Sequence, residues 1–322
     1  MRRSGPGASA LVAAVGLAVV LALAACTAPA TAPSPSPQAT GGTAVSPTAT
    51  AAPAVPSPAV SSAVSSVVSS AVSSVVSSVI SGAALPDVHL PGVNDPDCRS
   101  EHPPVVLLPG TFSTVAGTYG PLATALAAAG RCVYGANYGL GGLAPVRDSA
   151  LSVAGVVDGV LAATGADRVD VVAYSQGGLV LRTALRDDGL ADRVGTAVLI
   201  APTFHGTTSP LLDGVPGAVC PACADQIAGS ALLTELDAGG DLDGAVRYAT
   251  IASRDDTVVT PVAAQSPSGP ADRVTSLVVQ DRCPQVRLDH VALPGDPRVI
   301  DWVVAALAAQ GRPDPSAFPC AG

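Results

Sequence analysis

The pattern of hydrophobic and polar positions divides the chain near residue 84. From residue 85 onward, short apolar runs alternate with segments of helical spacing. The runs predict strands, and the segments between them predict helices. Strands that alternate with helices predict an α/β domain, in which a mostly parallel sheet is covered by helices on both faces. A single domain over residues 85–322 is long enough for this arrangement.

Turn signals bound the predicted elements. Pro109-Gly110 ends the first apolar run, and Gly130 and Gly165 follow two of the helical segments, as helix-ending glycines do. The predicted strands cover residues 105–108, 131–134, 169–173, 197–200, 248–252 and 274–279. The predicted helices cover residues 119–129, 148–163, 176–186 and 297–309.

The first 25 residues have the pattern of an export signal. Arg2 and Arg3 precede an apolar run, residues 10–22, that is too short to cross a bilayer comfortably. Residues 23–26, Leu-Ala-Ala-Cys, match the lipobox typical of bacterial lipoproteins. We therefore predict lipidation of Cys26 and an outward-facing anchor on the cell membrane. The alternative is an ordinary cleaved signal and a secreted protein.

Residues 26–84 consist mainly of Ala, Pro, Ser, Thr and Val and carry almost no charge. This composition predicts a disordered spacer between the membrane and the domain. Val-Ser-Ser recurs every four residues from Val60 to Val76, which places the valines on one stripe of a weakly held helix. A stalk or adhesive coil is the alternative.

The charge of the chain narrows the possible partners. The net charge is −9, and the chain contains no lysine. Nucleic acid requires a basic face, so it is excluded as a partner. Docking on anionic lipid through a basic patch is disfavoured for the same reason. We expect a monomer.

The cysteines predict a disulfide framework. Six remain after Cys26, and an even number in an exported protein predicts three disulfides. Cys220 and Cys223 form a C-x-x-C motif, for which zinc binding or redox chemistry are alternatives. No second ligand pair or thioredoxin-like pattern accompanies the motif, so structural bridges are favoured. We expect neither a metal nor an organic cofactor.

Residues 173–178, Ala-Tyr-Ser-Gln-Gly-Gly, lie between a predicted strand and a predicted helix. This is the context of a nucleophile elbow, a tight turn that lifts a serine hydroxyl above the sheet of an α/β-hydrolase fold. Ala173 replaces the usual first glycine, and the two later glycines leave room for the helix to pack on the strand. We predict Ser175 as the nucleophile. The alternative is a serine N-cap on an ordinary helix.

A serine hydroxyl needs a base, and in this fold the nucleophile, the acid and the histidine follow one another along the chain. Of the four histidines, only His290 lies late enough in the sequence. His205 either lines the pocket or belongs to a surface loop. Asp255 and Asp256 both follow a late strand, and local spacing does not choose between them. Asp289 is expected to brace its loop.

Stabilisation of an oxyanion needs two backbone donors. One is expected from the N–H of Gln176, which follows the nucleophile. The other is expected from Thr111, in the loop after the first strand, with the threonine hydroxyl as a third donor. A plain strand-to-helix turn is the alternative for this loop.

Together these motifs resemble the fungal lipase B family and the secreted actinobacterial triacylglycerol lipases, over about residues 92–320. The resemblance implies that Asp256 is the acid. It also implies three disulfides, Cys98–Cys132, Cys220–Cys223 and Cys283–Cys320. The stretches that carry it are residues 107–111 (oxyanion loop), 175–180 (nucleophile), 201–202, 206–207, 229–232, 256–261 (acid) and 289–290 (histidine).

Two departures from the family accompany the resemblance. Thr203 stands where lipase B carries an acidic pocket residue, and residues 209–244 are not clearly matched. The resemblance implies a carboxylic ester hydrolase, a triacylglycerol lipase or esterase with an acyl-serine intermediate. An acyltransferase or polyesterase with the same triad, a peptidase, and a catalytically silent surface-anchored protein are the alternatives. The apolar side chains beside the motifs predict an acyl pocket from Leu179, Val258, Val259, Val291 and Leu293.

Overall fold

The computed structural model describes residues 88–321. The predicted export signal, Cys26 and the spacer lie outside the described residues. One six-stranded parallel sheet forms the centre, in the order β2-β1-β3-β4-β5-β6. Its strands are β1 (Val105–Leu108), β2 (Val133–Gly135), β3 (Val169–Tyr174), β4 (Val194–Ile200), β5 (Arg247–Ala252) and β6 (Val274–Val278). The predicted α/β class with a parallel sheet is confirmed.

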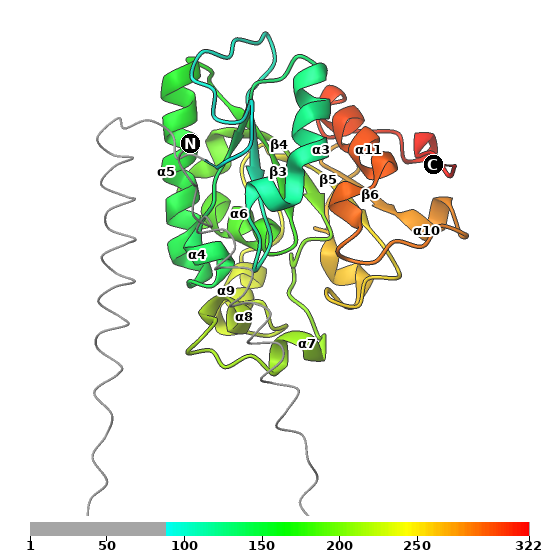
Figure 1. Ribbon diagram of the computed structural model, residues 1–322. Coiled ribbons are helices and arrows are strands. Elements are labelled where there is room, and N and C mark those ends of the chain that lie inside the picture. Colours follow the sequence, from blue (N-terminus) through cyan, green and yellow to red (C-terminus); the bar gives the residue numbers. More distant parts are fainter. Residues whose placement is uncertain (1–87, 322) are drawn as a thin grey trace, which may run out of the picture. The chain divides into compact units, whose positions relative to one another are not determined.

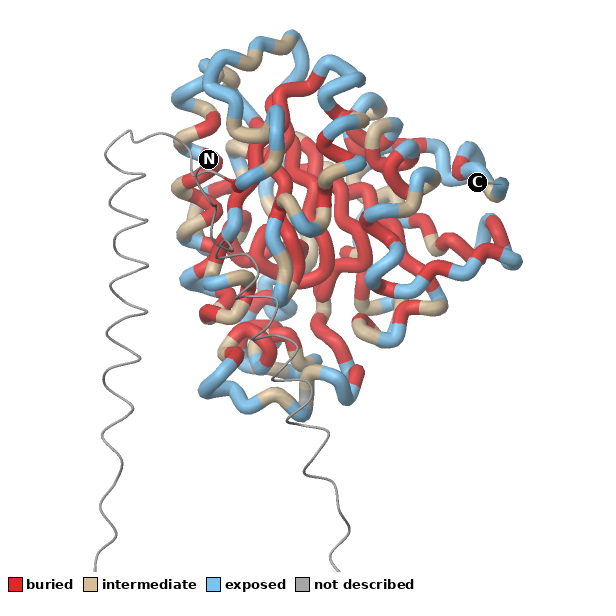
Figure 2. The backbone as a smooth tube through the Cα atoms, viewed as in Figure 1, coloured by how far each residue is buried: buried red, intermediate tan, exposed pale blue. Residues whose placement is uncertain are grey.

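Helices cover both faces of the sheet (Figure 1). On one face lie α5 (Val146–Thr164) and α6 (Gln176–Asp187), and on the other lie α3 (Val115–Ala128) and α11 (Pro297–Ala308). Successive side chains of a strand point to opposite faces, so Val106 and Leu108 pack with α5 and α6, whereas Val105 and Leu107 pack with α3 and α11. The strands are therefore buried on both sides, as the red centre of Figure 2 shows.

The remaining short helices were not predicted from the pattern. Several follow the carboxyl ends of β2 and β4, and α7, α8 and α9 lie together at one end of the domain in Figure 1. The short α-helices are α4 (Gly139–Gly142), α7 (Pro210–Asp213), α8 (Pro221–Asp225), α9 (Ala231–Ala238) and α10 (Val279–Arg282). The 3₁₀ turns cover Leu190–Asp192, Val262–Gln265, Leu293–Gly295 and Pro315–Ala317.

Most predicted boundaries differ from the structure by one to four residues, and two of the differences have a clear local cause. The helix expected from residue 119 begins at Val115, because the Thr114 side chain accepts a hydrogen bond from the Gly117 N–H and caps the first turn. The strand expected to reach residue 279 ends at Val278, where the chain turns into α10. Neither change moves a candidate site residue.

Three disulfides join Cys98 to Cys132, Cys220 to Cys223 and Cys283 to Cys320. These are the pairs that the family resemblance implies, and they are compatible with an exported protein. Within residues 88–321, no helix is both long enough and apolar enough to cross a membrane.

Candidate active site

Ser175 occupies a sharp turn between β3 and α6. Its backbone has φ 55° and ψ −124°, a conformation that costs energy in a residue with a side chain. Neighbouring backbone holds the turn on both sides, because the Ser175 N–H donates to Ile200 O at 3.0 Å and Ser175 O accepts from the Thr203 N–H at 3.1 Å. The turn places the serine at the carboxyl edge of the sheet, as the predicted elbow requires.

A chain of hydrogen bonds connects Ser175 to His290 and Asp256. The Ser175 Oγ lies 3.0 Å from His290 Nε2, and His290 Nδ1 lies 2.7 Å from Asp256 Oδ2. A carboxylate only accepts, so Nδ1 carries the proton and leaves Nε2 free to accept from the serine hydroxyl. The three predicted residues therefore meet in a nearly water-free setting, each with at most 6% of its surface exposed.

The Asp256 carboxylate is held in one orientation. Its Oδ1 accepts from the N–H groups of Val258 and Val259 at 2.8 and 2.9 Å. Its Oδ2 also accepts from Gln265 Nε2 at 3.1 Å, beside the bond from His290. Four donors thus fix both oxygens, which leaves the carboxylate no freedom to turn away from the imidazole.

The neighbouring acids have other partners. Asp255 Oδ2 accepts from Gln280 Nε2 at 3.1 Å and from the Leu288 N–H at 3.2 Å, so it braces the segment that leads to the histidine. Asp289 Oδ1 accepts from the Ala292 N–H at 2.9 Å. Asp289 therefore braces its loop, and of the three carboxylates only that of Asp256 forms a hydrogen bond with the His290 ring.

Tyr174 supports the histidine, a contact that no sequence pattern indicated. Its hydroxyl donates to His290 O at 3.0 Å, and the two rings lie 5.0 Å apart between centroids. Burial is the main cause that raises the pKa of Tyr174 above its usual value, and the negative charges of Asp256 and Asp289 raise this pKa further. Tyr174 therefore remains a neutral donor that fixes the backbone of His290.

The loop after β1 lies against the serine. A Cβ at Gly110 would stand 3.0 Å from Ser175 Cβ, which is tighter than most Cβ contacts, so glycine favours this close approach. Two buried tyrosines hold the start of the loop: the Tyr119 hydroxyl donates to Leu108 O at 2.8 Å, and the Tyr138 hydroxyl donates to Pro109 O.

Thr111 and Gln176 carry backbone N–H groups that are free to donate hydrogen bonds beside Ser175. Among the described residues, the backbone N–H groups of Thr111 and Gln176 donate to no protein acceptor. A Cβ at Gly142 would lie 3.0 Å from Thr111 Cα and 2.5 Å from the Gln176 side-chain Oε1, so Gly142 packs closely against both residues. The arrangement offers two unused backbone donors beside the serine, which an oxyanion needs.

The five predicted pocket residues do not line one cavity. Leu179, Val259 and Leu293 have no exposed surface, and Leu179 and Leu293 belong to the core clusters on opposite faces of the sheet. The prediction is wrong for these three, because a strand or helix next to a motif also supplies the core. Val258 is half-buried, and Val291, beside His290, is 77% exposed.

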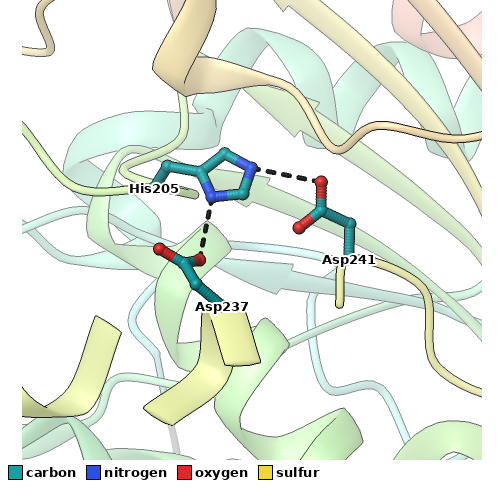
Figure 3. A group of neighbouring side chains, drawn as sticks. All are labelled: His205, Asp237 and Asp241. Carbon is teal, nitrogen blue, oxygen red and sulfur yellow. Dashed lines mark hydrogen bonds and ion pairs between the residues drawn. The ribbon is translucent and has the colours of Figure 1, made fainter. Parts of the chain in front are cut away.

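His205 takes no part in the hydrogen-bonded chain of the serine. It lies between two carboxylates, with Nδ1 2.9 Å from Asp237 Oδ1 and Nε2 3.3 Å from Asp241 Oδ2 (Figure 3). Among the described residues, these three form the group that could hold a metal ion, with ligand atoms within 4.8 Å of one another.

Arg182 already pairs with both carboxylates of this group. Its Nη1 and Nη2 lie 2.7 and 3.3 Å from the same two carboxylates, and its side chain is fully buried. A divalent cation between them would be repelled by the guanidinium at short range, so the charges favour an ion-paired network over a metal site. This network joins the loop after β4 to the end of α9.

The parallel sheet, the strained elbow and the serine at the carboxyl edge define the α/β-hydrolase fold. A family model described as the alpha/beta hydrolase fold matches residues 103–218. The structure of lipase B from Aspergillus fumigatus is similar, with 25% sequence identity and a TM-score of 0.61 over 69% of this chain and 56% of that lipase. The protein is therefore an α/β-hydrolase-fold protein that resembles lipase B, and it spans little more than half of that lipase's length.

Other solved structures are more distant. Esterase RhEst1 from Rhodococcus sp. ECU1013 shares 19% identity, with a TM-score of 0.45 over 66% of this chain and 94% of that one. The mature lipase BlEst2 of Bacillus licheniformis shares 16% identity, with a TM-score of 0.39 over 48% of this chain and 69% of that one. No curated protein sequence matches the chain.

Proposed function

We propose that the protein is a carboxylic ester hydrolase, a triacylglycerol lipase or esterase, with Ser175 as nucleophile, His290 as base and Asp256 as the acid that orients it. The observation that carries the proposal is the continuous hydrogen-bonded chain from Ser175 Oγ through His290 to Asp256 Oδ2. The resemblance to lipase B supports the ester class of substrate.

The geometry supports a two-step mechanism. His290 Nε2 takes the hydroxyl proton as Ser175 Oγ attacks the carbonyl carbon of the ester, and Asp256 stabilises the imidazolium that forms. The tetrahedral intermediate collapses when His290 returns the proton to the leaving alkoxide, which departs as an alcohol. Water then attacks the acyl-serine with His290 again as base, releasing the carboxylic acid and regenerating the serine.

The negative charge of the tetrahedral intermediate needs donors that are oriented before the reaction. The N–H groups of Thr111 and Gln176 are free for this role, and their positions are fixed by the loop after β1 and by the first turn of α6. No cofactor or metal enters these steps.

The surface beside the serine supports an apolar ester. Phe112 follows Thr111 and is 66% exposed, and Val291 follows His290 and is 77% exposed. The Phe112 N–H donates to Gly141 O at 2.7 Å, which fixes the place of this residue beside α4. Exposed apolar side chains at a site entrance favour acyl chains over charged substrates.

We also propose that the chain is exported as a monomer and anchored through a lipid on Cys26. The disulfides of the domain support an oxidising environment. Substitution of Cys26 by Ala is expected to move the protein from the membrane fraction to the soluble exported fraction. Retention of the variant on membranes would contradict the anchor.

The decisive experiment measures hydrolysis of p-nitrophenyl esters, from acetate to palmitate, by the full chain. Ser175→Ala is expected to lose turnover by on the order of 10⁶-fold with unchanged thermal stability. A fluorophosphonate probe is expected to label the wild type at Ser175 and to leave the variant unlabelled. The chain-length optimum then separates a lipase from a short-chain esterase.

Ser152→Ala is a matched control, because Ser152 lies on α5 and forms no side-chain hydrogen bond with the site residues. It should retain full activity and labelling. A folded wild type that hydrolyses none of the esters would overturn the ester-hydrolase proposal. Labelling at another serine would overturn the assignment of Ser175.

A further inference from the structure

Gln226 is a buried polar residue beside the candidate active site that no motif marks. It follows α8 as the C-cap of that helix, and 1% of its surface is exposed. Its backbone is fixed at both ends, since its N–H donates to Ala222 O at 3.2 Å and its carbonyl accepts from the Thr207 N–H at 2.9 Å. The side chain therefore leaves a rigid support.

The orientation of the Gln226 amide follows from its partners. Nε2 lies 3.0 Å from Ala222 O, which can only accept, so the amino group faces this carbonyl. The second proton of Nε2 points to Thr111 Oγ1 at 3.1 Å. On the other side, Oε1 accepts from the Thr203 hydroxyl at 3.3 Å.

This contact decides what the Thr111 hydroxyl can do. Gln226 Nε2 occupies a lone pair of Oγ1, so the hydroxyl keeps its own proton for donation. In the resting structure that proton has only a long acceptor, Gln226 Oε1 at 3.4 Å. A hydroxyl that accepts one hydrogen bond is a stronger donor in the next. The Thr111 hydroxyl is thus ready to turn towards a new acceptor beside its own free N–H.

We propose that Gln226 is a positioning residue that holds the Thr111 hydroxyl as a donor to the oxyanion. Gln226 touches neither the serine nor the histidine in the described structure, so it acts through Thr111. The inference rests on the ester hydrolysis proposed above and adds a residue to it. The short α8 helix, closed by the disulfide between Cys220 and Cys223, supplies the support.

A double-mutant cycle on the full chain tests the inference. Thr111→Val removes the hydroxyl and keeps the N–H, and should lower kcat by roughly 10- to 100-fold. Gln226→Met should lower kcat by about 10-fold, with KM within about 2-fold, because the lost contact strengthens only in the transition state. If Gln226 acts through the hydroxyl, the double variant should be no slower than Thr111→Val alone.

Gln226→Glu gives a readout that a purely structural role would not produce. An ionised carboxylate cannot donate to Thr111 Oγ1 and would capture the hydroxyl proton, whereas a protonated carboxyl can still donate. The kcat of this variant relative to wild type should therefore recover as the pH is lowered. Gln285→Met, at an exposed position, is the matched control and should keep wild-type kcat.

The outcomes separate this inference from the proposed function. Independent, multiplicative losses in the cycle, wild-type kcat in Gln226→Met, or a relative kcat of Gln226→Glu that is flat with pH would each overturn the inference alone. If Gln226→Met does not fold, the Gln226→Glu profile decides. A wild type without Ser175-dependent turnover would overturn the proposed function and this inference together.

Discussion

Two histidines of this domain each lie against an aspartate, and only one of them faces a serine. His290 has Asp256 at Nδ1 and Ser175 at Nε2, and its side chain is 7% exposed. His205 has Asp237 at Nδ1 and a second aspartate, Asp241, at Nε2, and its side chain is 25% exposed. An aspartate–histidine pair is thus present at both places.

The difference lies in the second nitrogen of each ring. At His290 that nitrogen meets a hydroxyl, from which a neutral imidazole can take a proton. At His205 it meets a carboxylate, which has no proton to give, and a buried guanidinium supplies the positive charge nearby. The same pair of side chains therefore suits proton transfer in one region and ion pairing in the other.

Replacing each histidine by alanine should give the largest contrast. His290→Ala removes the base and should lower kcat/KM by on the order of 10⁶-fold. His205→Ala should keep kcat/KM within about 2-fold and lower only the melting temperature. Ester hydrolysis and thermal unfolding of both variants measure the contrast. Comparable loss of activity in the two would contradict the separation of the regions.

The aspartates that bond to these two histidines, Asp256 and Asp237, should also differ in their effect on kcat. Asp256→Asn replaces the carboxylate by an amide of the same shape, which favours the wrong tautomer of His290. It should lower kcat by on the order of 10⁴-fold. Asp237→Asn should leave kcat unchanged, because its partners are His205 and Arg182. Steady-state kinetics on one ester compares them, and an active Asp256→Asn enzyme would remove this residue from the proposed mechanism.

Arg182→Met should be the most destabilising change in the His205 region. It removes a fully buried guanidinium and leaves Asp237 and Asp241 without their cation. Loss of one partner of a buried ion pair lowers the free energy of unfolding by about 3–5 kcal/mol. Because Asp237 is partly exposed to solvent, which screens its charge, we expect a loss of roughly 2 kcal/mol here. Urea unfolding at neutral pH measures the loss. Wild-type stability would show that the network contributes nothing.

The His205 region should also respond to acid. Burial raises the pKa of Asp237, but hydrogen bonds from Arg182 and His205 outweigh burial and hold this pKa below its usual value. The ionised carboxylate therefore stabilises the fold above pH ~4 and loses this contribution as the pH falls further. Melting temperatures from pH 6 to pH 2.5 should fall less steeply in Asp237→Asn than in wild type. Parallel curves would argue against the pairing.

Removal of metal ions should have the smallest effect. Because Arg182 pairs with both carboxylates beside His205 and would repel a divalent cation, a chelator is expected to change neither ester hydrolysis nor the melting temperature. A fall in melting temperature with chelator, restored by a divalent cation in wild type and absent in Asp241→Asn, would instead establish a metal site in this region.

Much of the site was predictable because its signals are local. Buried parallel strands are continuous apolar runs, so the strand before Ser175 and the helix after it could be read from the pattern. Few residues compete for the base, since the chain has four histidines and only His290 follows the candidate acids. The choice of Asp256 over Asp255 came from the family resemblance, because adjacent residues share the same local pattern.

The supporting residues were not predictable in this way. Tyr174 and Gln226 act through residues distant in sequence, since Tyr174 bonds to His290 116 positions away and Gln226 to Thr111 115 positions away. Gln265 is only nine positions from Asp256, but no local motif marks their contact. The pocket prediction failed at Leu179, Val259 and Leu293 for a related reason. Proximity to a motif says nothing about which side of an element faces the core.

The sequence by itself determined the order of strands and helices, the place of the elbow serine and the late histidine, because periodicity and turn residues act over a few positions. The family resemblance selected Asp256 over Asp255. Only the tertiary structure decided that His205 is ion-paired, that Tyr174 supports His290, and that Gln226 reaches Thr111. These are contacts between side chains from separate elements. They exist because packing of helices on the sheet brings the loops at its carboxyl edge within hydrogen-bonding distance.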